Sequence, residues 1–362
     1  MIWRIFQPFF SIFLVVLYLG YSLPTWAQET TASGKKRPTI AVVFAGGGAK
    51  GAAHVGVLKE LERMRIPVDI VTGTSMGAYV GALYAMGMSP EQIEKSMTSV
   101  DWNTGYRDRV ERSEKRLREK AYDDKYQIQA DLGLNREGFS VPKGVVQGQN
   151  MLQLIRQTSG NPSEFKSFDD LAVRYRAVAT DVVNLKPVVL DKGSLVDVMM
   201  ASMSVPGALP PYEYQNMLLV DGGVTNNMPV DVARSLGADI IIAIDISTNY
   251  KTKEQLTTLL SVADQLSNYM VRRSTQEQTE KLLNQDILIK PAVGSMETTD
   301  FVDMPKALKL GQEAAVAHKS QLSRYRVSKA DYQAYVDAKQ QVYASIKQKK
   351  RRKIASVTIK NN

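Results

Sequence analysis

Ser75 occupies the centre of a G-x-S-x-G sequence, with Gly73 two positions before it and Gly77 two positions after it. Apolar residues flank this motif at 67–71, the length of a short buried strand, and at 78–85, which is typical of a helix. A strand, a tight turn and a helix would form a nucleophile elbow, where glycine leaves room for the turn and the helix N-terminus stabilises negative charge near the serine oxygen. The chemistry predicted is acyl transfer through a serine ester.

These five residues also fit a plain strand–helix turn in which a serine caps the helix, because glycine and serine are common. A serine nucleophile needs two further groups: donors that stabilise the oxyanion, and a base that takes the hydroxyl proton. The rest of the sequence supplies a candidate for each.

A second glycine-rich turn lies between a predicted buried strand at 39–44 and a helical pattern with apolar Val55, Leu58 and Leu61. Consecutive glycines let backbone N–H groups approach a developing oxyanion without side chains in the way. The candidate oxyanion-hole residues in this turn are Gly46, Gly47, Gly48, Ala49, Lys50 and Gly51.

The same turn satisfies G-x-G-x-x-G, which is the fingerprint of a dinucleotide site. An acidic residue about 20 positions further on would bind the ribose, and Asp69 lies 18 residues after Gly51. This second interpretation, a nucleotide-binding oxidoreductase, leaves Ser75 unexplained, and we expect no cofactor.

The candidate base for Ser75 is Asp221, which ends an apolar stretch and is followed by Gly222 and Gly223. A buried carboxylate close to a serine hydroxyl can act as a base when burial raises its pKa towards the working pH. The competing interpretation is an ordinary Asp-Gly turn, which is a very frequent arrangement.

The three motifs are more specific as a set. The glycine turn, the serine elbow about 25 residues later and the distal Asp-Gly-Gly occur in this order, and a proline-bearing segment at 201–206 precedes the aspartate. Over residues 38–320 the chain resembles the patatin-like phospholipase family, in the form found in exported bacterial proteins.

The resemblance implies an α/β fold, a three-layer α/β/α sandwich with a mainly parallel central sheet. It also implies a lipid acyl hydrolase of the phospholipase A or lysophospholipase type that uses Ser75 as nucleophile and Asp221 as general base, without histidine. The turn at 46–51 would supply the oxyanion hole. The family often has arginine where this chain has Lys50, which keeps the charge but loses the guanidinium fork.

Two alternatives stay open at this point. The order Ser75, Asp221, His318 also matches the triad order of an α/β-hydrolase esterase, although His318 falls within a helical pattern. The other alternative is a non-catalytic lipid-binding protein on the same fold.

Composition excludes several other classes of site. The 362-residue chain has no cysteine and only two histidines, His54 and His318, so disulfides, thiolate metal sites and histidine-rich metal sites are ruled out and we expect no metal. Hydrophobic residues make up 44% of the chain, which allows a substantial core.

The N-terminus reads as a cleaved secretory signal. Arg4 is the only charged side chain among the first 27 residues, an apolar run at 9–20 follows, and Ala27 marks a plausible cleavage point. The run is shorter than the roughly 20 residues that a spanning helix needs, so an uncleaved anchor is the less favoured interpretation. We expect export to the periplasm or the medium.

The remaining pattern predicts strands alternating with helices, and hence a parallel sheet covered by helices. The predicted domains are a signal peptide at 1–27, a linker at 28–37, the catalytic domain at 38–322 and a helical, basic tail at 323–362. The further strands expected are 175–181, 187–190, 216–220 and 239–245, and the long helices 254–283, 305–322 and 329–347.

Two charged segments remain. Residues 101–125 mix both signs, as in an exposed helix or loop, and residues 347–353 carry much of the net charge of +9. A solvated tail is the simpler interpretation of 347–353, and contact with anionic lipid headgroups is the functional one. The expected partners are an acyl-ester substrate such as phospholipid and a membrane surface, not nucleic acid.

Overall fold

The computed structural model divides the chain into two units, residues 1–37 and 38–362. The signal peptide predicted at 1–27, nearly all of the predicted linker, part of the charged segment and the end of the basic tail lie outside the described residues. The structure describes residues 37–107, 115–125, 133–135, 138–140, 146–250, 252–257, 259–294 and 296–349.

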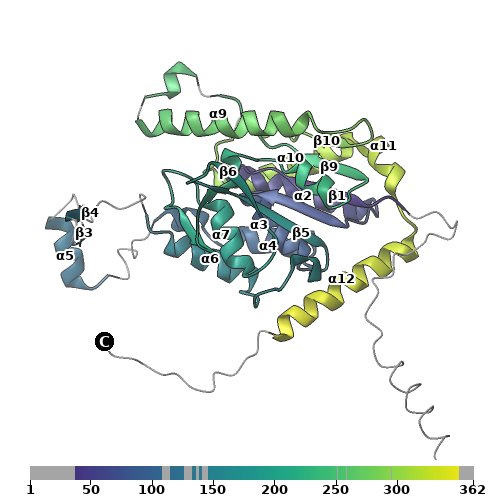
Figure 1. Cartoon of the computed structure of the whole chain (residues 1–362), viewed down its shortest axis with the longest axis horizontal. Helices are drawn as coiled ribbons and strands as arrows, with labels where there is room; N and C mark the ends of the chain where they lie inside the picture. The colour runs from purple at the N-terminus through teal and green to yellow at the C-terminus, as the bar shows by residue number, and fades with distance from the viewer. Residues whose placement is uncertain are drawn as a thin grey trace, which may run out of the picture. The chain divides into compact units, whose positions relative to one another are not determined.

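Among the described residues, eight strands form one mixed sheet in the order β10-β9-β1-β2-β5-β8-β7, with β6 paired to β5 (Figure 1). The neighbours from β10 to β5 are all parallel, and β6, β7 and β8 pair antiparallel. The strands of this sheet are β1 (Ile40–Phe44), β2 (Ile70–Thr74), β5 (Arg174–Asp181), β6 (Lys186–Leu190), β7 (Tyr212–Tyr214), β8 (Met217–Asp221), β9 (Ile240–Ile244) and β10 (Ile287–Ile289). A separate hairpin pairs β3 (Gly133–Asn135) with β4 (Gly138–Ser140).

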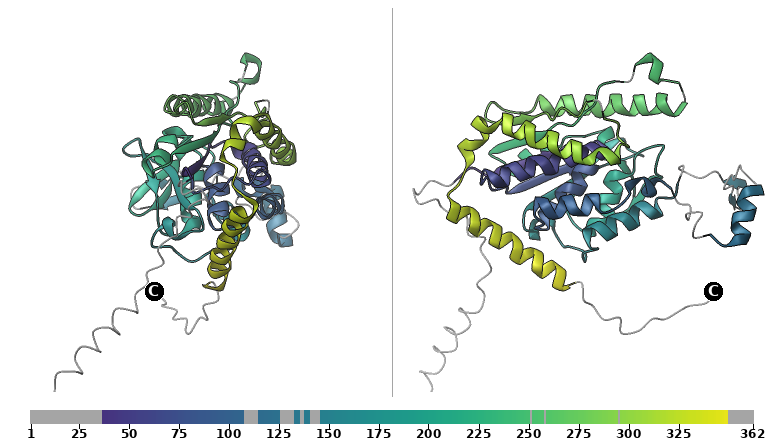
Figure 2. Two further views of the ribbon diagram at one scale, coloured as in Figure 1. Left: turned by 90° about the vertical axis from the view of Figure 1, so that its right-hand side faces the viewer. Right: turned by 180° about the vertical axis from the view of Figure 1, so that it is seen from behind.

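Helices cover both faces of the sheet, so the predicted three-layer sandwich is confirmed. On one face α8 contacts β1, β2 and β9, and on the other face α3 contacts β1, β2 and β5. Figure 2 shows α9 on the opposite side of the sheet from α3 and α4. The α-helices are α2 (Ala52–Arg63), α3 (Met76–Ala85), α4 (Pro90–Thr98), α5 (Leu117–Lys125), α6 (Gln149–Ser159), α7 (Leu195–Met203), α8 (Val230–Ser235), α9 (Leu259–Thr279), α10 (Met304–Ala317), α11 (Lys319–Leu322) and α12 (Lys329–Lys349). The 3-10 helices are η1 (Gly48–Gly51), η2 (Trp102–Tyr106), η3 (Phe168–Asp170), η4 (Gly222–Val224), η5 (Lys253–Gln255), η6 (Phe301–Asp303) and η7 (Ser323–Tyr325).

The strand before the serine motif begins later than its apolar pattern predicted. The prediction placed it at 67–71, and the structure has β2 at Ile70–Thr74. Pro67 has no N–H to donate to a sheet, and the N–H of Asp69 bonds the carbonyl oxygen of Ile40 at the very start of β1. The strand therefore runs directly into the turn that carries Ser75, with no loop between them.

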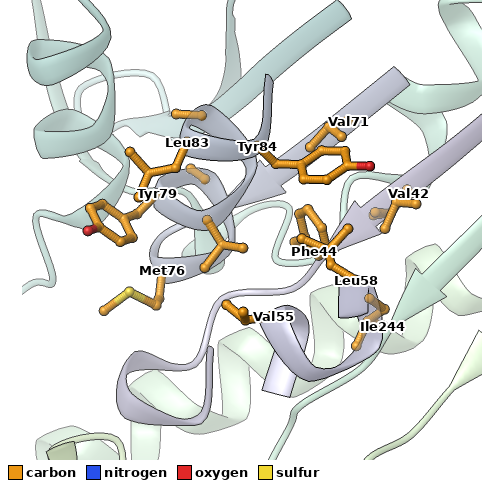
Figure 3. Close-up of a cluster of buried hydrophobic side chains, with 14 of the residues drawn as sticks. Val42, Phe44, Val55, Leu58, Val71, Met76, Tyr79, Leu83, Tyr84 and Ile244 are labelled. Carbon is orange, nitrogen blue, oxygen red and sulfur yellow. The ribbon is translucent and has the colours of Figure 1, made fainter. Parts of the chain in front are cut away.

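The helix that follows this turn packs into the apolar core. Every residue of α3 is buried, which fits its uniformly apolar sequence. Figure 3 shows Leu83 and Tyr84 of α3 in one cluster with Phe44 of β1 and Val71 of β2. This packing fixes the first turn of α3 against the sheet, and with it the position of Ser75.

The C-terminal helix α12 packs on the same unit. The hydroxyl of Tyr335 donates to the carbonyl of Val68 at 3.0 Å, and the ammonium of buried Lys339 lies 3.5 Å from the ring centroid of Tyr84. Burial lowers the pKa of Lys339 to about 8, and the nearby Glu62 carboxylate opposes that shift. Among the described helices, none is long and apolar enough to cross a membrane.

Candidate active site

Ser75 lies at a sharp turn between β2 and α3. Its backbone has φ 56° and ψ −128°, which is a strained conformation for a residue with a side chain. Its hydroxyl makes no capping bond to the helix, although Ser75 is the N-cap residue of α3. The oxygen is therefore left for chemistry, at the positive end of a ten-residue helix.

The two glycines of the motif are required by close packing. A Cβ on Gly73 would lie 2.4 Å from the carbonyl oxygen of Gly77, and a Cβ on Gly77 would lie 2.4 Å from the carbonyl oxygen of Phe44. Because both neighbours are backbone atoms, they cannot move aside without moving helix α3 or strand β1. The G-x-S-x-G pattern is thus a steric requirement of this turn.

Strand pairing brings Ser75 and Asp221 together. One edge of β5 pairs first with β2, where Val178 faces Thr74, and then with β8, where Ala179 faces Asp221. The other edge of β5 is occupied by β6. The C-terminal ends of β2 and β8 therefore meet along β5, with the serine and the aspartate at the junction.

Asp221 is buried, and the hydroxyl of Ser75 lies close enough to its carboxyl to stabilise the charged form. Burial raises the pKa of that carboxyl to about 6, because water no longer stabilises the charge, while the Ser75 hydroxyl and the N–H of Gly223 oppose that shift. The Gly223 bond is 2.7 Å long. A carboxylate with this pKa is ionised at neutral pH and is still basic enough to accept a proton.

The glycine turn at 46–51 lies beside this pair. The N–H of Gly46 donates to the carbonyl of Asn227 at 3.1 Å, and the N–H of Ala49 donates to the carbonyl of Thr298 at 2.9 Å. The N–H groups of Gly47 and Gly48 have no acceptor among the described residues. Of the six predicted oxyanion-hole residues, these two therefore keep backbone donors unused.

A pocket opens over these groups. Apolar side chains, including Val205, Pro206 and Ile246, line part of it, and Lys50 and Arg272 also reach it. Its other lining residues are Gly46, Gly47, Gly48, Ser75, Asp221, Val224, Asn227, Ser247, Thr248, Ser267, Asn268, Val271 and Thr298. Lys50 is buried, and its ammonium donates to the hydroxyl of Thr248 at 3.4 Å.

Sequence reasoning missed two residues that hold the site together. The buried hydroxyl of Ser202 accepts the N–H of Ser75 at 2.8 Å, and its segment was singled out only for its prolines. The side-chain amide of Asn227 donates to the hydroxyl of Thr275 at 3.0 Å and to the carbonyl of Gly46 at 3.4 Å. Nothing in a single sequence marks Asn227 beyond its position after Asp-Gly-Gly.

The residues of the rival hypotheses lie elsewhere. His318 follows α10 directly, and its Nδ1 bonds the carbonyl of Ala314 at 2.8 Å, away from the pocket. A carboxylate oxygen of Asp69 accepts the N–H of Ile40 at 2.8 Å, at the opposite end of β1 from the glycine turn. The structure thus gives neither a histidine partner for Ser75 nor a ribose-binding acid beside the turn.

The second histidine is structural. His54 is fully buried in α2, its Nε2 bonds the carbonyl of Ala45 at 2.8 Å, and burial lowers its pKa to about 4. In the part of the chain that the structure describes, no cluster of three His, Asp or Glu residues could hold a metal ion.

The family model described as patatin-like phospholipase matches residues 42–234, more than half of the chain. The chain belongs to the patatin-like phospholipase family. The match begins in β1 and ends in α8, so it spans the glycine turn, the elbow and the Asp-Gly-Gly sequence of this family member.

Curated relatives carry family names. The chain is 35% identical over 216 residues to the mouse patatin-like phospholipase domain-containing protein 6, covering 59% of this chain and 14% of that protein. It is 31% identical over 210 residues to lysophospholipase NTE1 of Meyerozyma guilliermondii, covering 58% of this chain and 13% of the relative. The chain thus spans about a seventh of the length of such relatives.

Among solved structures, VipD from Legionella pneumophila aligns with 82% of this chain and 70% of its own, at 15% identity and a TM-score of 0.41.

Proposed function

We propose that this protein is a serine lipid acyl hydrolase of the phospholipase A or lysophospholipase type, with Ser75 and Asp221 as its catalytic dyad. The observation that carries the proposal is the position of the Ser75 hydroxyl beside the buried Asp221 carboxylate. Both residues line a pocket in which the N–H groups of Gly47 and Gly48 have no acceptor among the described residues. Family membership supports the same activity.

The first half of the reaction forms an acyl-enzyme. Asp221 takes the hydroxyl proton of Ser75, and the serine oxygen attacks the acyl carbonyl to give a tetrahedral oxyanion. Asp221 then returns the proton to the leaving alcohol of the lipid as the ester bond breaks. In the second half, Asp221 takes a proton from water as the water oxygen attacks the acyl-serine ester. The bond to the Ser75 oxygen then breaks, Asp221 returns the proton to that oxygen, and a fatty acid is released.

The oxyanion hole of this reaction consists of the N–H groups of Gly47 and Gly48. The N–H groups of Gly46 and Ala49 support them indirectly, because their bonds to Asn227 and Thr298 hold the turn in place. Losing one oxyanion donor typically slows turnover by about 10²–10³-fold. The N-terminus of α3 adds favourable charge at the serine.

The site of action is a second part of the proposal. The signal sequence at 1–27 predicts an exported bacterial protein in the periplasm or medium, and the basic residues at 347–353 predict contact with anionic membrane lipid. Recovery of the exported protein with Gln28 as its first residue supports the export proposal. Retention of Met1 on a membrane-bound form contradicts it.

The test of the activity uses chain that begins at Gln28, since residues 38–362 form their own compact unit. Fatty-acid release from mixed phospholipid vesicles is measured for this protein and for its Ser75→Ala variant. We expect release by the first and a loss of at least 10³-fold in the second. A lysophospholipid and a short-chain ester are run in parallel to separate the substrate classes.

Equal release by both proteins would place the nucleophile at another residue. No release from any ester by folded protein would contradict the proposed hydrolase and favour a lipid-binding role on the same fold.

A further inference from the structure

One face of α9 belongs to the candidate active site. Ser267, Asn268, Val271 and Arg272 line the pocket. Their spacing of i, i+1, i+4 and i+5 places all four on one side of the helix, the side that faces the pocket. Any surface that contacts the opposite side of α9 is therefore within one helix diameter of the pocket.

The C-terminal half of α9 is hydrogen-bonded to the segment that follows Asp221 in the chain. The hydroxyl of Ser274 accepts the N–H of Asn227 and donates to the carbonyl of Gly223, both at 3.1 Å. Gln278 bonds Asp231 through both its amide oxygen and its amide nitrogen, at 3.1 and 2.9 Å. These polar contacts fix which side of the helix faces inward.

The opposite side of the N-terminal half is apolar and exposed. Leu266 is 61% exposed, and three other large side chains are between 39% and 51% exposed. We call this set the apolar stripe, and it consists of Val262, Leu266, Tyr269 and Met270. The spacing i, i+4, i+7, i+8 places all four on one face of a helix. Figures 1 and 2 show α9 on the outside of the unit.

Arginines border the stripe on its C-terminal side. Among the described residues before and after it in the chain, Lys253, Arg272 and Arg273 are basic and Glu254 is acidic, and Arg273 pairs with exposed Glu277 at 3.1 Å. The guanidinium of Arg272 lies 4.3 Å from the ring centroid of Tyr250. An exposed apolar helix face bordered by arginine and tyrosine is the pattern of a helix that lies in a membrane interface.

We propose that the apolar stripe of α9 inserts into the surface of an anionic phospholipid bilayer and so sets the pocket against the lipid it receives. The proposal rests on the proposed function, because a pocket for acyl esters must receive its substrate from a lipid aggregate.

The test compares the stripe with a matched pair of exposed apolar residues far from the site. The stripe variant is Leu266→Gln with Met270→Gln, and the control is Leu283→Gln with Val316→Gln. Leu283 is 51% exposed and precedes β10, and Val316 is 45% exposed near the end of α10. Both control positions lie towards the amino ends of the parallel strands, whereas the site lies at their carboxyl ends.

Binding is measured first, in a Ser75→Ala background that leaves the vesicles intact. Co-sedimentation uses vesicles of phosphatidylglycerol and phosphatidylethanolamine. We expect the stripe variant to bind at least tenfold more weakly than its parent and the control to bind within twofold of it. Binding to phosphatidylcholine vesicles should be weaker for all three proteins.

Activity is measured second, with Ser75 restored. The stripe variant should hydrolyse vesicle phospholipid at least tenfold more slowly than wild type, while hydrolysing a soluble short-chain ester at the wild-type rate. If no form hydrolyses any ester and vesicle binding still depends on the stripe, the proposed function fails and the surface assignment stands.

A tryptophan reporter gives a reading that does not depend on a loss of function. Tyr269→Trp should show a blue-shifted emission when vesicles are added, and Leu283→Trp should show none. The proposal is overturned if folded stripe variant binds vesicles like its parent, or if Tyr269→Trp shows no shift. It is also overturned if wild type is a dimer that the stripe variant breaks while vesicle binding is unchanged.

Discussion

The main-chain N–H of Ser75 donates a hydrogen bond to Oγ of Ser202 at 2.8 Å, and that hydroxyl donates in turn to the carbonyl of Val178 at 2.6 Å. A side chain from α7 thus holds the strained residue of the elbow and attaches it to β5. Ser75 cannot relax from its positive φ without breaking this chain of bonds.

Ser202→Ala should therefore impair catalysis. The buried N–H of Ser75 and the carbonyl of Val178 would lose their partner, which costs about 1–3 kcal/mol of unfolding free energy. We expect kcat on a short-chain ester to fall about tenfold, with KM nearly unchanged, because the nucleophile shifts. Steady-state kinetics and chemical denaturation measure both effects.

The matched control for that variant is Ser204→Ala. Ser204 is equally buried, but its hydroxyl bonds only the carbonyl of Met200 in the preceding helix turn. A kcat that falls equally in both variants would show that Ser202 has no special role at the elbow.

Gly48→Ala should abolish most of the activity. Gly48 has φ 56°, and an added Cβ would lie 2.2 Å from the carbonyl oxygen of Thr298, so the turn must shift. Displacing the oxyanion donors should reduce kcat by about 10²–10³-fold. Gly160→Ala is the control, because Gly160 also has positive φ (73°) and an added Cβ there meets nothing within 4 Å. Similar losses in both would assign the effect to general destabilisation.

Activity should rise with pH through a midpoint near pH 6 and level off above about pH 7. Asp221 accepts a proton only as the carboxylate, and burial raises its pKa to about 6. A pH profile of kcat/KM for a short-chain ester between pH 4 and 8 checks this. A midpoint near pH 4 would mean that the carboxyl is solvated and not buried as described.

Asp221→Asn should be inactive but more stable than wild type at neutral pH. The folded-state pKa of Asp221 lies above its value in the unfolded chain, so its stability contribution is full below about pH 4 and is lost as pH rises through 6. The difference between an ordinary aspartate pKa of 3.8 and a pKa of about 6 corresponds to roughly 3 kcal/mol of unfolding free energy. Urea unfolding of both proteins should show nearly equal unfolding free energies at pH 4 and a higher unfolding free energy for Asp221→Asn at pH 7.5.

His318→Ala should keep wild-type activity. The imidazole bonds the carbonyl of Ala314 in its own helix and lies outside the pocket lining. A loss of more than tenfold in kcat with unchanged stability would revive the histidine triad and weaken the dyad.

The sequence by itself determined the local geometry. Gly73 and Gly77 dictate a tight strand–helix turn around Ser75, because only glycine fits between backbone atoms at those positions. The apolar run at 67–71 ends shortly before Ser75 and another ends next to Asp221, so the sequence placed both residues near the ends of buried strands. The order of the motifs matches one family.

Only the tertiary structure decided how these pieces meet. Ser75 and Asp221 are 146 residues apart, and they are joined because β2 and β8 share one edge of β5, which depends on non-local hydrogen bonds that no local pattern encodes. The roles of Ser202 and Asn227 follow from the same long-range packing. The raised pKa of Asp221 is likewise a property of burial, and burial exists only once the whole chain has folded around the carboxylate.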